Sequence, residues 1–208
     1  MAENQELILT EAQIDALREV GNIGAGHAAT ALSQMVGKKR IMISVPDVKV
    51  IEKDGISKYI DEPDALATGV VMNVLGDIVA KIILLIKKES ALHLADILLK
   101  KKPGTSKLLT ELETSAVKET GNILSGAYMN ALNEFLGLML LPSVPNLVFD
   151  TSSAILSAIL DSFEDVSSKI LSIETLFIET NENVLKGYLL LMPDRPSVNV
   201  ILNTIRVK

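Results

Sequence analysis

Apolar residues recur at helical spacing in two long segments of this chain, one in each half, close to the 3.6-residue period of an α-helix. In the first segment they are Ile14, Leu17, Ile23, Ala28, Ala31, Leu32 and Met35. Thr10 followed by Gln13 has the capping-box pattern that begins a helix, and Thr110 followed by Glu113 repeats it. We therefore predict one long helix in each half, the second over about residues 111–135.

Between and after these helices, β-branched residues alternate with polar ones, which is the period-two pattern of strands. The predicted strands are residues 40–51, 68–74, 78–86, 147–149, 170–179 and 184–192, and the further predicted helices are residues 90–100, 151–163 and 197–206. The predicted fold class is therefore α/β, of the mixed α+β kind, with the two long helices packed with a β-sheet.

The two long helices share polar as well as apolar residues, at a constant separation of one hundred residues. Glu19 and Asn22 recur as Glu119 and Asn122. A duplicated core needs matching apolar residues, but it does not need the same carboxylate and amide at the same spacing. A period this long indicates a duplicated, pseudo-symmetric domain rather than a solenoid of short repeats.

The duplication extends along most of the chain. A Ser-Val-Pro sequence that ends at Pro46 recurs with its end at Pro145, now ninety-nine residues apart, so one residue was gained or lost between the copies. We expect a single domain over residues 1–208, composed of two pseudo-symmetric halves at about residues 9–103 and 109–208.

Side chains four and then three residues apart lie in one narrow stripe of a helix, which turns about 100° per residue. Asp15 precedes Glu19 and Asn22 at this spacing, and Ser115 takes its place in the second copy. We expect both stripes at the surface. One copy alone would suit an ordinary solvated helix face, since exposed glutamate is common. Two copies at identical spacing favour a functional role. Asparagine is also a mediocre helix former, so its presence in the middle of both helices indicates a role as well.

Composition and charge exclude several classes of function. The chain has no cysteine, and its net charge of −6 without a basic stripe argues against nucleic-acid binding. The two histidines, His27 and His93, have no ligand cluster beside them, so we expect no metal site. The chain shows neither the basic start of a secretory signal nor a run of about twenty apolar residues, so we expect a cytoplasmic protein without membrane insertion.

A glutamate and an asparagine can orient a water molecule and contact a cation, although they include no activated nucleophile. They suffice where the electrophile is already activated and the metal arrives with the substrate. Phosphoryl transfer is such a reaction, because its catalysis is mostly positioning and charge stabilisation. The glycines over residues 21–26 do not indicate a nucleotide site, since they follow no strand and lack the G-x-G-x-x-G order.

The doubled motif, with Asp15 and Ser115 at its first positions and a Val-Pro after each copy, closely resembles the CheC family of chemotaxis phosphatases, in the CheC, CheX and FliY superfamily. In that family a proline follows the asparagine after 22 residues; Pro145 fits, and Pro46 lies one residue farther away. CheX-type relatives carry one motif per chain and dimerise. Two motifs therefore favour the CheC type, with a single CheC-like domain, and a monomer is expected.

The resemblance implies a hydrolase of two-component signalling that acts on the aspartyl phosphate of the response regulator CheY. Asn22 and Asn122 would each position the attacking water. Glu19 and Glu119 would contact the regulator, with its active-site lysine as the expected partner. The Mg²⁺ would belong to the phosphorylated regulator, so we expect no cofactor in this chain itself.

The resemblance also implies binding to CheD, a receptor deamidase, through the extra helix of the second half. We expect Asp150, Ala154 and Ile155 to contact it, although the apolar residues of an amphipathic helix suit a core equally well. Two alternatives remain open: a mainly non-catalytic adaptor that sequesters CheD, and a scaffold whose stripes are ordinary surface.

Overall fold

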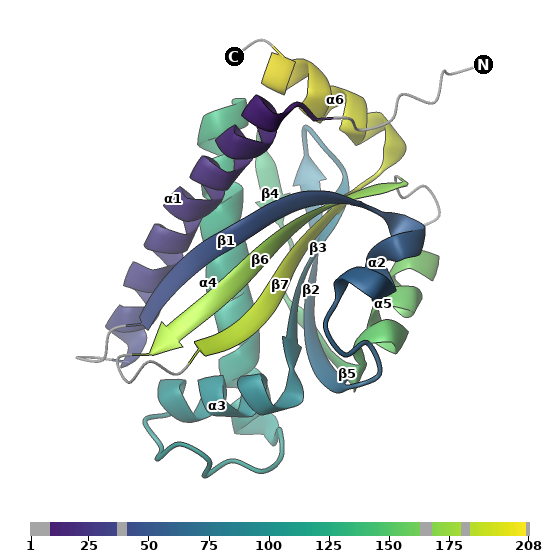
Figure 1. Cartoon of the computed structure of the whole chain (residues 1–208). Coiled ribbons are helices and arrows are strands. Elements are labelled where there is room, and N and C mark those ends of the chain that lie inside the picture. The colour runs from purple at the N-terminus through teal and green to yellow at the C-terminus, as the bar shows by residue number, and fades with distance from the viewer. Residues whose placement is uncertain (1–8, 37–40, 163–167, 180–183, 207–208) are drawn as a thin grey trace.

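The computed structural model describes residues 9–36, 41–162, 168–179 and 184–206, in which seven strands form one curled sheet with helices around it (Figure 1). The elements are α1 (Glu11–Val36), β1 (Ile41–Glu52), a 3₁₀ turn (Lys53–Gly55), α2 (Ile56–Tyr59), β2 (Leu66–Gly76), β3 (Ala80–Lys87), α3 (Lys88–Leu98), α4 (Glu111–Leu136), β4 (Leu140–Pro142), β5 (Asn146–Thr151), α5 (Ser152–Asp161), β6 (Lys169–Glu179), β7 (Val184–Pro193) and α6 (Arg195–Arg206). The predicted mixed α+β class is confirmed.

Strand pairing interlocks the first and second halves of the chain. The order is β1-β6-β7-β3-β2-β4, with β5 also paired to β2, and every pairing is antiparallel. The first strand of the chain thus pairs with β6 of the second half, while β4 and β5 of the second half pair with β2 of the first. At the centre β3 meets β7, with Ile83 opposite Leu190 and Leu84 opposite Leu189. Each half therefore completes the sheet of the other.

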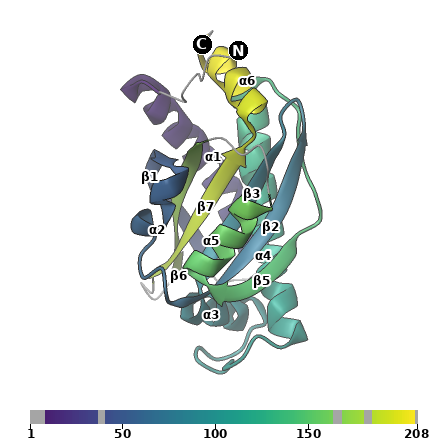
Figure 2. The same ribbon diagram turned by 90° about the vertical axis from the view of Figure 1, so that its right-hand side faces the viewer.

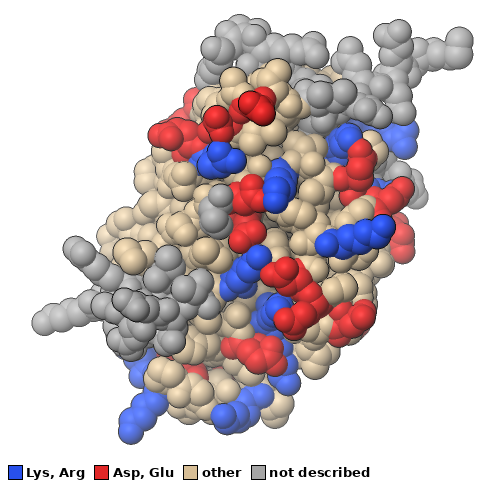
Figure 3. All heavy atoms as spheres, in the orientation of Figure 1, with Lys and Arg blue, Asp and Glu red and all other residues tan. Residues whose placement is uncertain are grey.

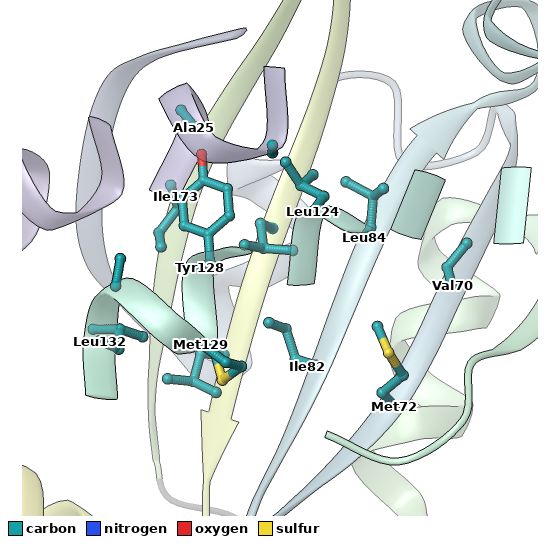
Figure 4. Packing of buried hydrophobic residues seen from close by; sticks show 14 of the residues in the cluster. Ala25, Val70, Met72, Ile82, Leu84, Leu124, Tyr128, Met129, Leu132 and Ile173 are labelled. Carbon is teal, nitrogen blue, oxygen red and sulfur yellow. The ribbon is translucent and has the colours of Figure 1, made fainter. Parts of the chain in front are cut away.

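The two long helices cover one face of the sheet. α1 and α4 lie side by side and run in opposite directions, and α3 lies near the start of α4 (Figure 1). Met72, Ile82 and Leu84 are buried in the core on this side of the sheet. The ring of Tyr128 points from α4 toward Ala25 of α1, so the same core continues between the helices (Figure 4).

A second layer of helices covers the opposite face. The short helix α2 and the extra helix α5 lie there (Figure 2), and their buried side chains include Ile56 and Ile155. Ile83 and Leu85 reach them because successive side chains of β3 point to opposite faces of the sheet. Strand β3 is buried on both sides for this reason, which explains its nearly continuous apolar sequence.

The capping boxes predicted at both long helices are confirmed. The Thr10 amide donates to Oε1 of Gln13 at 2.8 Å, and the Gln13 amide donates to Oγ1 of Thr10 at 3.3 Å. The Thr110 amide donates to Oε2 of Glu113 at 3.2 Å. Each helix therefore begins where its sequence predicts.

Several boundaries differ from the predictions. Strand β3 begins at Ala80 rather than at residue 78, because Gly76 adopts a φ of 124° and Asp77 donates its amide to the carbonyl of Met139 at 2.9 Å. Helix α5 ends at Asp161, and residue 163 lies outside the described residues. Strand β4 and helix α2 were not predicted. No helix among the described residues is long and apolar enough to cross a membrane.

Candidate functional site

The predicted stripe on α1 lies at the surface. Asp15, Glu19 and Asn22 are all exposed, whereas Leu17 and Val20 on the other side of the helix are buried. The spacing of the motif explains this arrangement, since residues four and three apart share one face. The predicted exposure of the first stripe is confirmed.

The stripe on α4 has the same arrangement. Ser115, Glu119 and Asn122 are exposed, while Val117 and Leu124 are fully buried. Because α1 and α4 pack against each other, the structure brings the two motif helices together on one face of the sheet (Figure 1).

The glutamates and asparagines of both stripes are left unpaired by the described part of the chain. The side chains of Glu19, Asn22, Glu119 and Asn122 form no hydrogen bond or ion pair with any residue that the structure describes. Asp15 differs, because its Oδ1 accepts a hydrogen bond from Nη1 of Arg18 at 2.6 Å. The two Glu–Asn pairs can therefore contact an external group without breaking an existing interaction.

Both motif prolines lie at irregularities of the outer strands. Pro46 lies where the β1–β6 register shifts, and Pro145 separates β4 from β5. Beside Pro145, the amide of Ser143 donates to the carbonyl of Asn73 at 2.8 Å, and its hydroxyl accepts from the Asn73 amide at 3.0 Å. Proline suits such edge positions because it cannot donate to a sheet ladder. β1 packs against α1 and β4 against α4, so each irregularity lies beside a motif helix.

The one-residue difference between the copies does not affect the helices. α1 and α4 both contain 26 residues. α1 ends at Val36 and β1 begins at Ile41, whereas α4 ends at Leu136 and β4 begins at Leu140. The additional residue thus falls within 37–40, which lies outside the described residues.

The residues predicted to bind CheD lie around α5, in the layer on the other face of the sheet. Asp150 is exposed, and its Oδ1 accepts a hydrogen bond from the Thr151 amide at 2.7 Å, while Ala154 is half-buried. Ile155 is only 3% exposed and packs against Gly69 of β2. The prediction that Ile155 contacts a partner is corrected: its side chain belongs to the core.

A buried carboxylate near the end of α3, which sequence reasoning missed, holds the connection to α4. Asp96 is 1% exposed and accepts hydrogen bonds from the amides of Thr105 at 2.9 Å and Ser106 at 3.1 Å. Burial raises the pKa of Asp96, but these hydrogen bonds outweigh burial and the net pKa is lowered. Asp96 therefore ties the end of α3 to the segment that leads into α4.

Glu113, in the first turn of α4, extends this network. Its carboxylate accepts hydrogen bonds from the ammonium group of Lys101, from the Ser106 hydroxyl at 3.1 Å and from the Thr110 amide. The hydrogen bond from Lys101, followed by that from the Thr110 hydroxyl, lowers the pKa of Glu113 to about 2. The sequence identified Glu113 as a cap only, because the spacing of Lys101 gives no sign of an ion pair across the connection.

Neither the surface charge nor the metal-ligating residues indicate a second functional site in the described part of the chain. Acidic and basic side chains are intermixed on the face that Figure 3 shows. Among the described residues, no group of three or more histidines and carboxylates could hold a metal ion. The Glu–Asn pairs are exposed, an arrangement that suits side chains which complete a site on another macromolecule.

The fold occurs in solved structures of FliY and FliM. The structure of Thermotoga maritima FliY superimposes with a TM-score of 0.75 at 21% sequence identity, and covers 97% of this chain and 99% of that one. The middle domain of FliM from H. pylori superimposes with a TM-score of 0.67 at 11% identity, over 94% of this chain and 99% of that one. These similarities concern the fold alone.

Sequence comparison defines the family. Residues 13–50 and 112–149, which contain the two motifs, match the CheC-like family. The CheY-P phosphatase CheC of Bacillus subtilis (strain 168) is 31% identical over 192 residues, which are 91% of both chains. The chain therefore belongs to the CheC-like family. The flagellar motor switch phosphatase FliY of the same organism is 30% identical over 126 residues, but these are only 32% of its length and 60% of this chain.

Proposed function

We propose that this chain hydrolyses the aspartyl phosphate of phosphorylated CheY, once at each motif helix. The similarity to CheY-P phosphatase CheC over 91% of both chains supports phosphatase activity. The observation that carries the assignment of residues is the exposure of two identical Glu–Asn pairs, which have no hydrogen-bond or ion-pair partner among the described residues. The cytoplasmic location and the monomeric state expected from the sequence stay predictions.

The amide of Asn22 or Asn122 would hold the attacking water, since an amide can both accept from and donate to it. Water attacks phosphorus, the bond to the aspartyl oxygen breaks, and inorganic phosphate and a free carboxylate result. Glu19 or Glu119 would contact the regulator and align it, which contributes because a misplaced nucleophile reacts far more slowly. The regulator would supply Mg²⁺, which balances charge on the transferred group.

The decisive experiment replaces both amides. In Asn22→Ala/Asn122→Ala, phosphate release from phosphorylated CheY should fall to the intrinsic rate of the regulator, because no residue then holds the water. Asn130→Ala is the matched control, since Asn130 is an exposed asparagine of α4 that lies outside the stripe motif. Undiminished stimulation by the folded double variant would refute the assignment.

A second function, CheD binding by the α5 region, is supported by the exposure of Asp150 at the end of β5. Asp150→Lys should abolish the complex. Asp150→Asn tests the charge separately, because its side-chain oxygen can still accept the Thr151 amide. If a folded Asp150→Lys protein still binds CheD, the placement of this surface is wrong. If the unaltered chain binds CheD but hardly accelerates phosphate release from phosphorylated CheY, the adaptor alternative is favoured.

A further inference from the structure

Gly26 and Gly126 occupy the same place in the two motif helices. Each lies four residues after the asparagine of its stripe, and therefore one turn farther along the same face. Both lie inside 26-residue helices, where glycine is less favourable than alanine. A glycine found twice in such a position requires a physical reason.

The packing of this chain does not provide that reason. A Cβ added at Gly26 or Gly126 would have no neighbouring atom within 4 Å in the described structure beyond the backbone of its own helix. Gly121 shows the contrast, because a Cβ there would lie 2.5 Å from Cγ1 of Val70. The backbone does not require glycine either, since neither Gly26 nor Gly126 has a positive φ.

The direction of helical side chains shows what the two glycines change. Each Cα–Cβ bond tilts toward the start of the helix, so a side chain at residue 26 would extend over the turn that carries Asn22. Without it, the C-terminal side of the Asn22 amide stays uncovered. Glu19 lies on the other side of that amide, and the same relation holds for residues 119, 122 and 126.

We infer that Gly26 and Gly126 are positioning residues, which leave an open notch beside Asn22 and Asn122 for the loop that carries the phosphoaspartate of the response regulator. The inference rests on the proposed function. In this arrangement, the backbone of the partner comes close to the C-terminal side of each asparagine. A side chain at residue 26 or 126 would hold the phosphoryl group away from the amide.

The test isolates one site at a time. In an Asn122→Ala background, which leaves the α1 site alone, Gly26→Met should lower kcat/KM for phosphorylated CheY by about tenfold or more, through a raised KM. Gly26→Ala should raise Tm while it lowers kcat/KM, a pair of opposite changes that a purely structural role would not produce. Gly126→Met in an Asn22→Ala background is the mirror experiment.

Gln34→Met and Glu134→Met are the matched controls, since both residues are exposed on the same helices, twelve residues beyond the asparagines and turned away from the stripe. They should leave kcat/KM unchanged. Binding of CheY activated with beryllofluoride provides a second measurement, and Gly26→Met should weaken it by a similar factor. If Gly26→Met and Gly126→Met bind and turn over like their backgrounds, the inference is overturned. If Asn22→Ala/Asn122→Ala keeps full activity, the proposed catalysis by the asparagines fails, and binding of activated CheY by the methionine variants still decides the role of the glycines.

Discussion

Gly24 on α1 lies directly against Tyr128 on α4. A Cβ at Gly24 would come within 3.1 Å of the Cα of Tyr128 and 3.3 Å of the carbonyl oxygen of Ala127. These are backbone atoms, which cannot turn aside as the end of a flexible side chain can. The contact therefore sets how closely the two motif helices pack, and with it the separation of the two stripes.

Gly24→Ala should lower the free energy of unfolding by about 1 kcal/mol. The added methyl group improves helix propensity by about 1 kcal/mol, but overpacking a close contact costs about 1–3 kcal/mol. Urea unfolding measures the difference. Gly26→Ala is the control in the same helix, because its Cβ would meet open space. Equal or greater stability of Gly24→Ala compared with Gly26→Ala would show that the helices can separate freely.

Stability should decrease in acid through the network around Glu113. Its pKa is lowered to about 2 in the folded protein from an ordinary value of 4.5. A carboxyl group with a lowered folded-state pKa stabilises the fold above its unfolded pKa, and this contribution is lost as pH falls toward the folded value. The free energy of unfolding should therefore fall between about pH 5 and pH 2, and Glu113→Gln should flatten this dependence.

Thermal unfolding from neutral pH to about pH 2.5 checks this expectation. Glu111→Gln removes one carboxylate from the same helical turn and is the reference for general charge effects, since Glu111 is exposed. If Glu111→Gln and Glu113→Gln show the same pH profile, the buried network is not the source of the acid sensitivity.

Ile155→Ala should destabilise the protein by about 2–5 kcal/mol, because it would leave a cavity where the side chain now packs against β2. Ala158→Arg, at an exposed position of the same helix, should leave the unfolding midpoint nearly unchanged. Calorimetry of both variants separates the buried side of α5 from its exposed side. A destabilising Ala158→Arg with a neutral Ile155→Ala would reverse that assignment.

The two stripes should act independently. They lie on different helices, and their glutamates and asparagines share no hydrogen-bond or ion-pair partner among the described residues. The activities of the single variants Asn22→Ala and Asn122→Ala should therefore add up to that of the unaltered chain, as expected for sites that share no partner. Phosphate release at limiting CheY-P measures this. A single variant that abolishes all activity would mean that one helix performs the reaction or that the sites are coupled.

Much of the secondary structure was readable from the sequence because it depends on near neighbours. Thr10 and Gln13 form their cap through residues three apart, and the stripe that contains Glu19 follows from the helical period alone. Strand β4 and helix α2 were missed because three or four residues are too few to show a period. The α5 helix was predicted, but its amphipathic pattern did not specify whether Ile155 packs in the core or contacts a partner.

The sequence by itself determined that the chain has two long helices, that each carries an exposed Glu–Asn pair, and that the pairs are copies of one another. These properties depend on spacing along the chain, which local hydrogen bonding converts directly into geometry. Only the tertiary structure decided that β1 pairs with β6 across the halves, that Gly24 lies against Tyr128, and that Lys101 reaches Glu113. Such contacts join residues whose proximity results from the packing of the whole core, and no local pattern records it.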